Sequence, residues 1–146
     1  MVAYSFKKQF VQPIRVGLSS VRLSFDPAPK LQTIRAHGKR RHARPGEPVQ
    51  LYTAMRTKQC ELIGVGICTE TPPITISLHS ARGLMTFHMD GRLIPSTSDE
   101  GIAFCQADGF ETPQHMWDFW RTEHPGVDSF DGVVIKWRPQ TAGERT

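Results

Sequence analysis

The residues with the most evident chemistry lie in one basic stretch, residues 30–44. Its fifteen positions hold six cationic side chains and two histidines, and no acid. Guanidinium and ammonium groups bind phosphate oxygens, and neutralising several phosphates releases counterions, so such binding depends strongly on salt. The stretch therefore predicts a site for a polyanion such as nucleic acid. The side chains that we expect to bind it here are Arg35, His37, Lys39, Arg40, Arg41 and Arg44.

Four residues beyond this stretch extend the predicted site. Tyr52, Arg56 and Lys58 follow on and after the next predicted strand. An aromatic ring among cations suits single-stranded nucleic acid, where stacking one base contributes about 1–3 kcal/mol. For cleavage of RNA, Lys58 would stabilise charge on the phosphorane, and Tyr52 would stack a base or exchange a proton. Ser129, expected in a loop before the last strand, is a further phosphate ligand, and Arg56 a further nucleic-acid contact.

The positive charge of the whole chain is concentrated in this region. The 146 residues carry a formal net charge of +4. Residues 27–60 have eight basic side chains against one acid, a net +7, whereas the remainder has ten against thirteen, a net −3. Such an asymmetry favours a polyanionic partner over a general role in solubility.

Alternating hydrophobicity and turn signals predict the elements that must position these residues. Strands are expected over residues 2–5, 49–53, 60–69, 74–78, 84–89, 92–94 and 132–138. Helices are expected from an N-cap at Ser5 to about residue 17, from a cap at Ser98 to 107, and from Thr112 to about 123. Strands clustered centrally, without βαβ alternation, predict an α+β fold. We expect a small, mostly antiparallel barrel flanked by about three α-helices.

Length and composition exclude several classes of protein. The chain suits one domain, expected over residues 1–138, with a flexible tail over 139–146. No uncharged apolar run approaches the roughly 18–20 residues that span a bilayer, and the N-terminal residues lack a secretory-signal pattern. We therefore expect a cytoplasmic protein without a membrane partner.

The cysteines and the possible metal ligands also exclude several kinds of site. The three cysteines contain no Cys-x-x-Cys pair, which favours reduced thiols over a disulfide framework or a structural zinc site. No His-Glu-x-x-His motif or carboxylate cluster is present, so we predict no tightly bound cofactor. A weakly held Mg²⁺, coordinated mainly by substrate phosphates and water, stays compatible with the sequence.

The basic stretch also resembles a known family. Lys30-Leu-Gln-Thr-Ile-Arg35 is similar to the Lys-x-x-Thr-Ile-Arg signature of the ASCH (activating signal cointegrator homology) domain family, a branch of the PUA-like β-barrels. The resemblance extends over roughly residues 2–138 and departs at 19–29, where we expect a shorter link with glycine before Lys30. Further similar segments are Ser5-Phe-Lys-Lys-Gln-Phe, Arg44-Pro-Gly-Glu-Pro-Val-Gln-Leu-Tyr-Thr, Cys60-Glu-Leu-Ile-Gly64, Ala107-Asp-Gly-Phe110 and Met116-Trp-Asp-Phe-Trp120.

The resemblance implies a PUA-like barrel with a basic cleft, used on RNA or nucleosides. Activities linked with the family are nucleic-acid binding, hydrolysis of RNA, and deacylation of acetylated cytidine by its small members. For deacylation, the family's lysine, threonine and acid correspond to Lys30, Thr33 and Asp108. A lysine of lowered pKa can deprotonate the threonine hydroxyl, which attacks the acyl carbon. The family has glutamate in the third role, and Asp108 is one methylene shorter.

Three functions follow as hypotheses. The leading one is binding and hydrolysis of single-stranded RNA in the cleft, with Tyr52 and Lys58 beside Lys30. The second is an amidohydrolase acting on nucleosides of the N4-acetylcytidine type, and the third is a non-catalytic reader of RNA; the sequence identifies no protein partner. A deep, narrow pocket joining Lys30, Thr33 and Asp108 favours a nucleoside, whereas an open groove along Tyr52 and Lys58 favours a strand.

Overall fold

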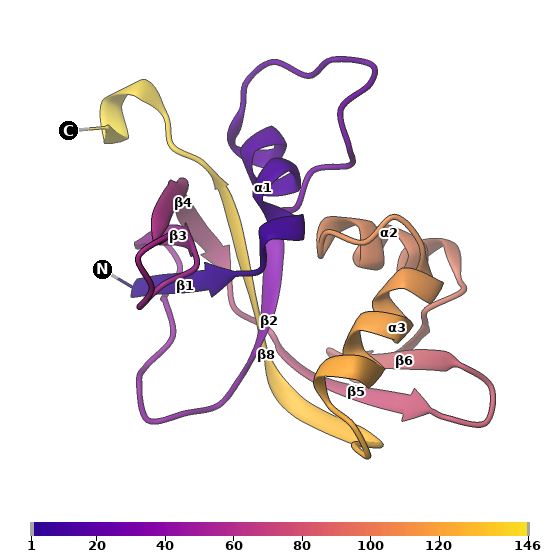
Figure 1. The fold of residues 1–146 in the computed structure, drawn as a ribbon. Helices are drawn as coiled ribbons and strands as arrows, with labels where there is room; N and C mark the ends of the chain where they lie inside the picture. The colour runs from indigo at the N-terminus through magenta and orange to yellow at the C-terminus, as the bar shows by residue number, and fades with distance from the viewer. Residues whose placement is uncertain (1, 146) are drawn as a thin grey trace.

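Eight strands and three α-helices make up the computed structural model, which describes residues 2–145 (Figure 1). The strands are β1 (Val2–Phe6), β2 (Gln32–Ala36), β3 (Pro48–Thr53), β4 (Glu61–Glu70), β5 (Pro73–His79), β6 (Leu84–Met89), β7 (Arg92–Pro95) and β8 (Ser129–Pro139). The α-helices and 3₁₀ helices are η1 (Lys8–Phe10), α1 (Val11–Leu18), α2 (Asp99–Ala107), α3 (Pro113–Glu123) and η2 (Ala142–Glu144).

The strands form one mostly antiparallel sheet in the order β1-β3-β4-β8-β5-β6-β7, with β2 paired to β8 off this path. The pair β1–β3 is parallel, and the other pairs within residues 2–145 are antiparallel. The predicted α+β class, with three α-helices around a mostly antiparallel sheet, is confirmed. The sheet does not close, because β1 and β7 lie at its two ends.

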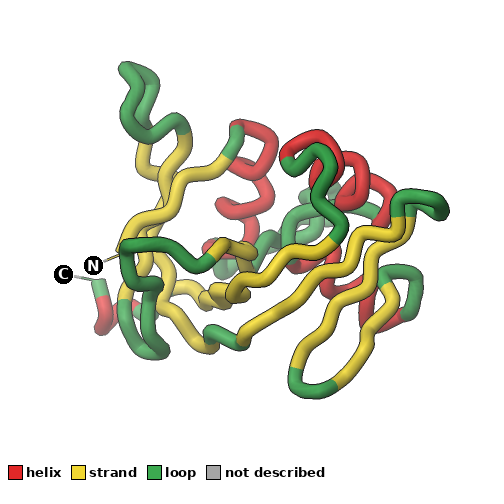
Figure 2. Tube along the Cα trace, turned by 90° about the horizontal axis from the view of Figure 1, so that it is seen from below, coloured by secondary structure: helices red, strands yellow, loops and turns green. Residues whose placement is uncertain are grey.

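Strand β8 joins the two halves of the sheet. Its first residues pair with β5 and its last residues pair with β4, while β2 pairs along its middle. Figure 1 shows β8 crossing the molecule, with α1 near β2 and with α2 and α3 on the side of β5 and β6. Helix α1 packs against β4 and β8, and α3 packs against β6. In Figure 2 the strands form a curved, twisted layer beside the helices.

Local signals predicted several elements correctly. Thr112 caps α3 by accepting a hydrogen bond from the His115 N–H at 3.1 Å, and Pro113 occupies the first turn, where no N–H is needed. Ser98 caps α2 in the same way. Asp90 and Gly91 adopt left-handed backbone with φ of 52° and 71°, which forms the expected hairpin between β6 and β7.

The predicted N-cap at Ser5 is wrong. Ser5 lies in β1, paired with Tyr52 of β3, and α1 begins only at Val11. The parallel pairing with a strand more than forty residues away overrides the local capping signal. Pro13 is accommodated because it lies in the first turn of α1, where its missing N–H costs no hydrogen bond.

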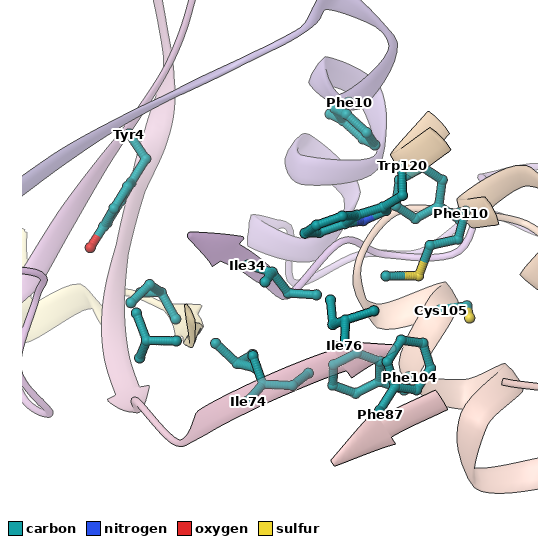
Figure 3. Close-up of a cluster of buried hydrophobic side chains, with 14 of the residues drawn as sticks. Tyr4, Phe10, Ile34, Ile74, Ile76, Phe87, Phe104, Cys105, Phe110 and Trp120 are labelled. Atoms are coloured by element: carbon teal, nitrogen blue, oxygen red, sulfur yellow. The ribbon is translucent and has the colours of Figure 1, made fainter. Parts of the chain in front are cut away.

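The hydrophobic core lies between the sheet and the helices. Figure 3 shows Ile74, Ile76 and Phe87 of the sheet near Phe104 of α2, and Trp120 of α3 near Phe10. The tail predicted to be flexible contains η2, where Glu144 forms an ion pair with Arg138 at 2.8 Å. No helix within residues 2–145 is long and apolar enough to cross a membrane.

Candidate functional site

A cavity of about 360 Å³ lies where the start of the chain, β2, the end of α2 and the end of α3 meet. Unlike four other depressions on the described part of the chain, it contains buried ionisable side chains. The motif of residues 30–35 contributes Lys30, Thr33 and Arg35 to it, and many of its other lining residues are aromatic. The cavity is lined by Ser5, Phe6, Lys7, Phe10, Lys30, Thr33, Ile34, Arg35, Ala36, Asp108, Phe110, Phe119, Trp120, Glu123, His124 and Phe130.

Lys30 lines this cavity and is almost fully buried, with only 2% of its surface exposed. Its Nζ donates a hydrogen bond to the backbone carbonyl oxygen of Asp108 and lies 3.9 Å from Asp108 Oδ1. The ammonium also lies 4.7 Å from the ring centre of Phe10. Burial lowers the pKa of Lys30, Asp108 opposes the change and Arg35 adds to it, so that the pKa is about 8. Lys30 can therefore exchange a proton near neutral pH.

Helix α1 fixes the backbone of Lys30. The Lys30 N–H donates to the carbonyl oxygen of Pro13 at 2.9 Å. At Gly17 the helix touches the same residue, since a Cβ at Gly17 would lie 2.6 Å from the carbonyl oxygen of Lys30. Glycine is required there by this close approach of two backbones. The backbone position of Lys30 is thus fixed by contacts that do not involve its side chain.

Asp108 lies at the C-terminal end of α2 and is 4% exposed. Its Oδ1 accepts a hydrogen bond from Gln32 Nε2 at 3.3 Å. Burial raises the pKa of Asp108 to about 6, while Lys30, Gln32 and Arg35 favour the carboxylate and limit the rise. At neutral pH the carboxylate therefore faces the Lys30 ammonium. Gln32 was not predicted as a site residue, because no strand was expected over residues 32–36 and a polar residue beside Thr33 is a weak signal by itself.

Thr33 and Arg35 project from the same face of β2. Arg35 Nε donates a hydrogen bond to Thr33 Oγ1 at 3.1 Å, and Nη2 donates to the backbone oxygen of Ser5 at 2.7 Å. The guanidinium also lies over the rings of Phe6 and Tyr4, at 4.9 and 5.3 Å. Because Thr33 accepts from Arg35, its own hydroxyl proton is available to a base. The neighbouring positive charge also stabilises the alkoxide that loss of this proton produces.

Aromatic rings form the walls of the cavity. Phe10 meets Phe110 and Phe119 edge to face, with ring centres 5.4 Å apart in both pairs. Trp120 stacks on His124 at 4.6 Å. Figure 3 shows Phe10, Trp120 and Phe110 gathered at one side of the core cluster. Such walls exclude water and suit a planar ligand. Trp120 belongs to the buried core and also lines the cavity, so the core opens to the cavity here.

The structure does not bring every predicted site residue to this cavity. Neither Tyr52, in β3, nor Lys58, in the exposed loop between β3 and β4, lines it. Arg56 is exposed in the same loop. Ser129 is the first residue of β8, paired with Ser77, and not a loop residue as predicted. The strand extends further than the alternating pattern because its start pairs with β5.

The remaining predicted cations lie in the connection between β2 and β3, and none of residues 37–44 lines the cavity. Arg41 is engaged by Glu47 through two hydrogen bonds, at 2.7 and 2.8 Å. These bonds, with one from the Arg44 backbone N–H, lower the pKa of Glu47 to about 2. The exposed side chains without an acidic partner among the described residues are His37, Lys39, Arg40 and Arg44.

Neither a related protein nor a metal-binding group of side chains among the described residues identifies the site. No family model, curated protein or solved structure matches the chain. Within residues 2–145, no group of three or more His, Cys, Asp or Glu side chains is placed to hold a metal ion. The site therefore consists of a buried lysine–aspartate pair and a threonine–arginine pair inside aromatic walls.

Proposed function

We propose that this protein is an amidohydrolase that removes an acyl group from the exocyclic amine of a nucleoside, with N4-acetylcytidine as the type of substrate. One observation carries the proposal: Lys30, Thr33, Arg35 and Asp108 line a single aromatic-walled cavity. The resemblance to the ASCH family supports it, since Lys30, Thr33 and Asp108 are the residues that correspond to the family's deacylation site.

The cavity suits a small planar substrate. Its volume of about 360 Å³ lies within the range of about 300–1,000 Å³ that small-molecule sites occupy. The rings of Phe10, Phe119 and Trp120 offer apolar surface to a base, and Lys30, Thr33 and Asp108 offer polar groups to its amide. An acylated base that enters with its amide first would present the acyl carbon to Thr33.

The first chemical step would transfer the acyl group to Thr33. Neutral Lys30 takes the hydroxyl proton as the Oγ1 attacks the acyl carbon, and negative charge develops on the carbonyl oxygen. Arg35, which already donates to Oγ1, supplies a positive charge next to the new bond. The intermediate then collapses: the C–N bond breaks, and the Lys30 ammonium returns its proton to the leaving amine.

The second step would release the acyl group as a carboxylic acid. Neutral Lys30 takes a proton from a water molecule, which attacks the ester carbon of acylated Thr33. When the C–O bond to Thr33 breaks, the Lys30 proton goes to the Oγ1 and restores the hydroxyl. Asp108 contributes by holding the amine of Lys30 in place through both steps.

Hydrolysis of RNA, the leading hypothesis from the sequence, receives less support from the geometry. It requires Tyr52 and Lys58 beside Lys30, and neither residue lines the Lys30 cavity. The pocket that joins Lys30, Thr33 and Asp108 is the arrangement that favours a nucleoside. Cleavage of RNA and non-catalytic RNA binding are the alternatives that the following assay separates.

The direct test is incubation of the purified protein with N4-acetylcytidine, with cytidine and acetate measured as products. Single-stranded RNA is incubated in parallel, with and without Mg²⁺. Stoichiometric cytidine and acetate support the proposal. Intact acetylcytidine together with cleaved RNA would contradict the proposal and support the ribonuclease hypothesis. No product from either substrate would contradict both and support non-catalytic RNA binding.

The pH dependence of the reaction follows from the state of Lys30. A general base must be neutral, so kcat/KM should rise with pH and level off above about 8, the pKa to which burial lowers Lys30. Asp108→Asn removes the negative charge that raises this pKa, so the rising limb should move to lower pH. The check is kcat/KM measured for both proteins from about pH 5 to pH 10. An unchanged limb, or one displaced to higher pH, contradicts the role of Lys30 as base.

A further inference from the structure

A second depression, of about 980 Å³, adjoins the proposed active site. It lies between β1, η1, α1 and the loop of residues 54–60, which joins β3 to β4. Ser5, Phe6 and Lys7 line both this depression and the Lys30 cavity, so the two adjoin at this segment. We call the second depression the β1–α1 groove. A substrate larger than a nucleoside would extend from the cavity into it.

The β1–α1 groove is positively charged. It is lined by three cations, Lys7, Lys8 and Arg15, and by one acid, Glu61. Arg15 pairs with Glu61 at 2.9 Å, and Lys7 pairs with Glu123 at 3.1 Å. Both pairs are exposed to solvent, where ion pairs contribute only about 0–1 kcal/mol, so an incoming anion can compete for the cations. Lys8 has no acidic partner among residues 2–145.

The loop of residues 54–60, which lines the groove through Ala54 and Gln59, carries two further cations. Ala54 and Gln59 of this loop line the groove, and the exposed Arg56 and Lys58 lie between them in the chain. Neither cation has an acidic partner within the described residues. The groove and this loop therefore offer a phosphate several cations, of which Lys8, Arg56 and Lys58 have no acidic partner among residues 2–145.

The same loop is held in a strained conformation. Ala54 and Arg56 have φ of 54° and 67°, the left-handed region, which costs a residue other than glycine about 1–3 kcal/mol. The loop is anchored at the shared rim, because the Met55 N–H donates to Ser5 Oγ at 3.3 Å and Thr53 Oγ1 donates to the Phe6 carbonyl oxygen at 2.9 Å. The two hydrogen bonds hold the strained loop against Ser5 and Phe6, which line both the groove and the cavity.

We infer that the β1–α1 groove binds the phosphate groups of the substrate, so that the acylated base is recognised on a phosphorylated nucleoside or a nucleic-acid strand. The inference rests on the proposed function. The shared chemistry is a phosphate joined to the sugar of the base that enters the Lys30 cavity. A groove of about 980 Å³ exceeds the space that one phosphate needs, which favours the flanking nucleotide of a single strand.

The test compares three substrates that carry the same acylated base: acetylcytidine, its 5′-monophosphate, and a short single-stranded oligonucleotide. We expect kcat/KM to be at least about 10-fold higher for a phosphate-bearing substrate, with the advantage falling as salt rises. Lys8→Glu should remove this advantage and leave the rate on acetylcytidine unchanged. A higher kcat/KM with the monophosphate indicates that the groove binds a single nucleotide. A higher kcat/KM with the oligonucleotide alone indicates that it binds a strand.

The matched control is Arg82→Glu, the same charge change at an exposed residue of the turn between β5 and β6. It should alter none of the three rates. Equal kcat/KM on all three substrates overturns the inference and leaves the proposed function intact. If no substrate is deacylated, the proposed function fails, and binding of the unacylated oligonucleotide decides the inference. Equal affinities of the Lys8→Glu and Arg82→Glu proteins then overturn it.

Discussion

Lys30→Met is expected to lower kcat/KM for acetylcytidine by about 10²- to 10⁴-fold, the range that a positioned general base contributes. Methionine has a similar length and can pack against the aromatic walls, but its sulfur cannot accept the Thr33 proton at neutral pH. Asp108 then loses its cationic partner, so its pKa rises further above about 6 and the neutral carboxyl is favoured. We expect the fold to persist because protonation of Asp108 avoids a buried unpaired charge.

Lys30→Arg is the control that separates charge from proton transfer. Arginine keeps a cation beside Asp108, yet it stays protonated throughout the accessible pH range and cannot act as a base. We expect it to be as inactive as Lys30→Met. Circular dichroism and thermal unfolding establish that both variants are folded. Activity within a few-fold of the parent protein in either variant contradicts the role of Lys30.

Thr33→Val is expected to reduce kcat by about 10³-fold or more, since the proposed nucleophile is removed from a side chain of nearly the same shape. Thr33→Ser keeps the hydroxyl and should retain activity within about 10-fold of the parent. The difference in kcat between these two variants separates the contribution of the Thr33 hydroxyl from that of side-chain packing in β2. Both are measured on acetylcytidine at saturating concentration.

The covalent intermediate provides a second measurement on the same residue. Rapid quenching of the parent protein should trap the acyl group as an ester of Thr33, visible in the mass of the intact protein and of its peptides. Thr33→Val should show no such product. If Thr33→Val turns over substrate while Lys30→Met does not, water is the nucleophile and Lys30 its base.

Local features of the fold were predictable, whereas long-range pairings were not. The caps of α2 and α3 and the turn at Asp90 follow from side chains acting within a few residues. Strand β2 was not predicted, because Gln32, Thr33 and Ile34 are all buried and show no alternation. Its conformation is set by pairing with β8, about a hundred residues further along the chain.

The polar part of the site was predictable from the motif, and its surroundings were not. Lys30, Thr33, Arg35 and Asp108 were expected to lie together, and they line one cavity although Asp108 is 78 residues from Lys30. Tyr52 was expected beside them because it follows closely in the chain. Ser5 lines the cavity and Tyr52 does not, because β1 pairs with β3 in parallel and places Ser5 opposite Tyr52.

The buried pair of Lys30 and Asp108 has a further consequence, which concerns the stability of the folded chain. Lys30 has a pKa of about 8 against an ordinary 10.5, so the unfolded chain binds more protons between these values and stability rises with pH. Asp108 has a pKa of about 6 against 3.8, so the folded chain binds more protons there and stability falls as pH rises. Between about pH 6 and 8, where both groups are charged, the pair therefore lowers the free energy of unfolding. The chain retains at neutral pH an arrangement that opposes its own folding, which is expected of residues kept for chemistry and not for structure.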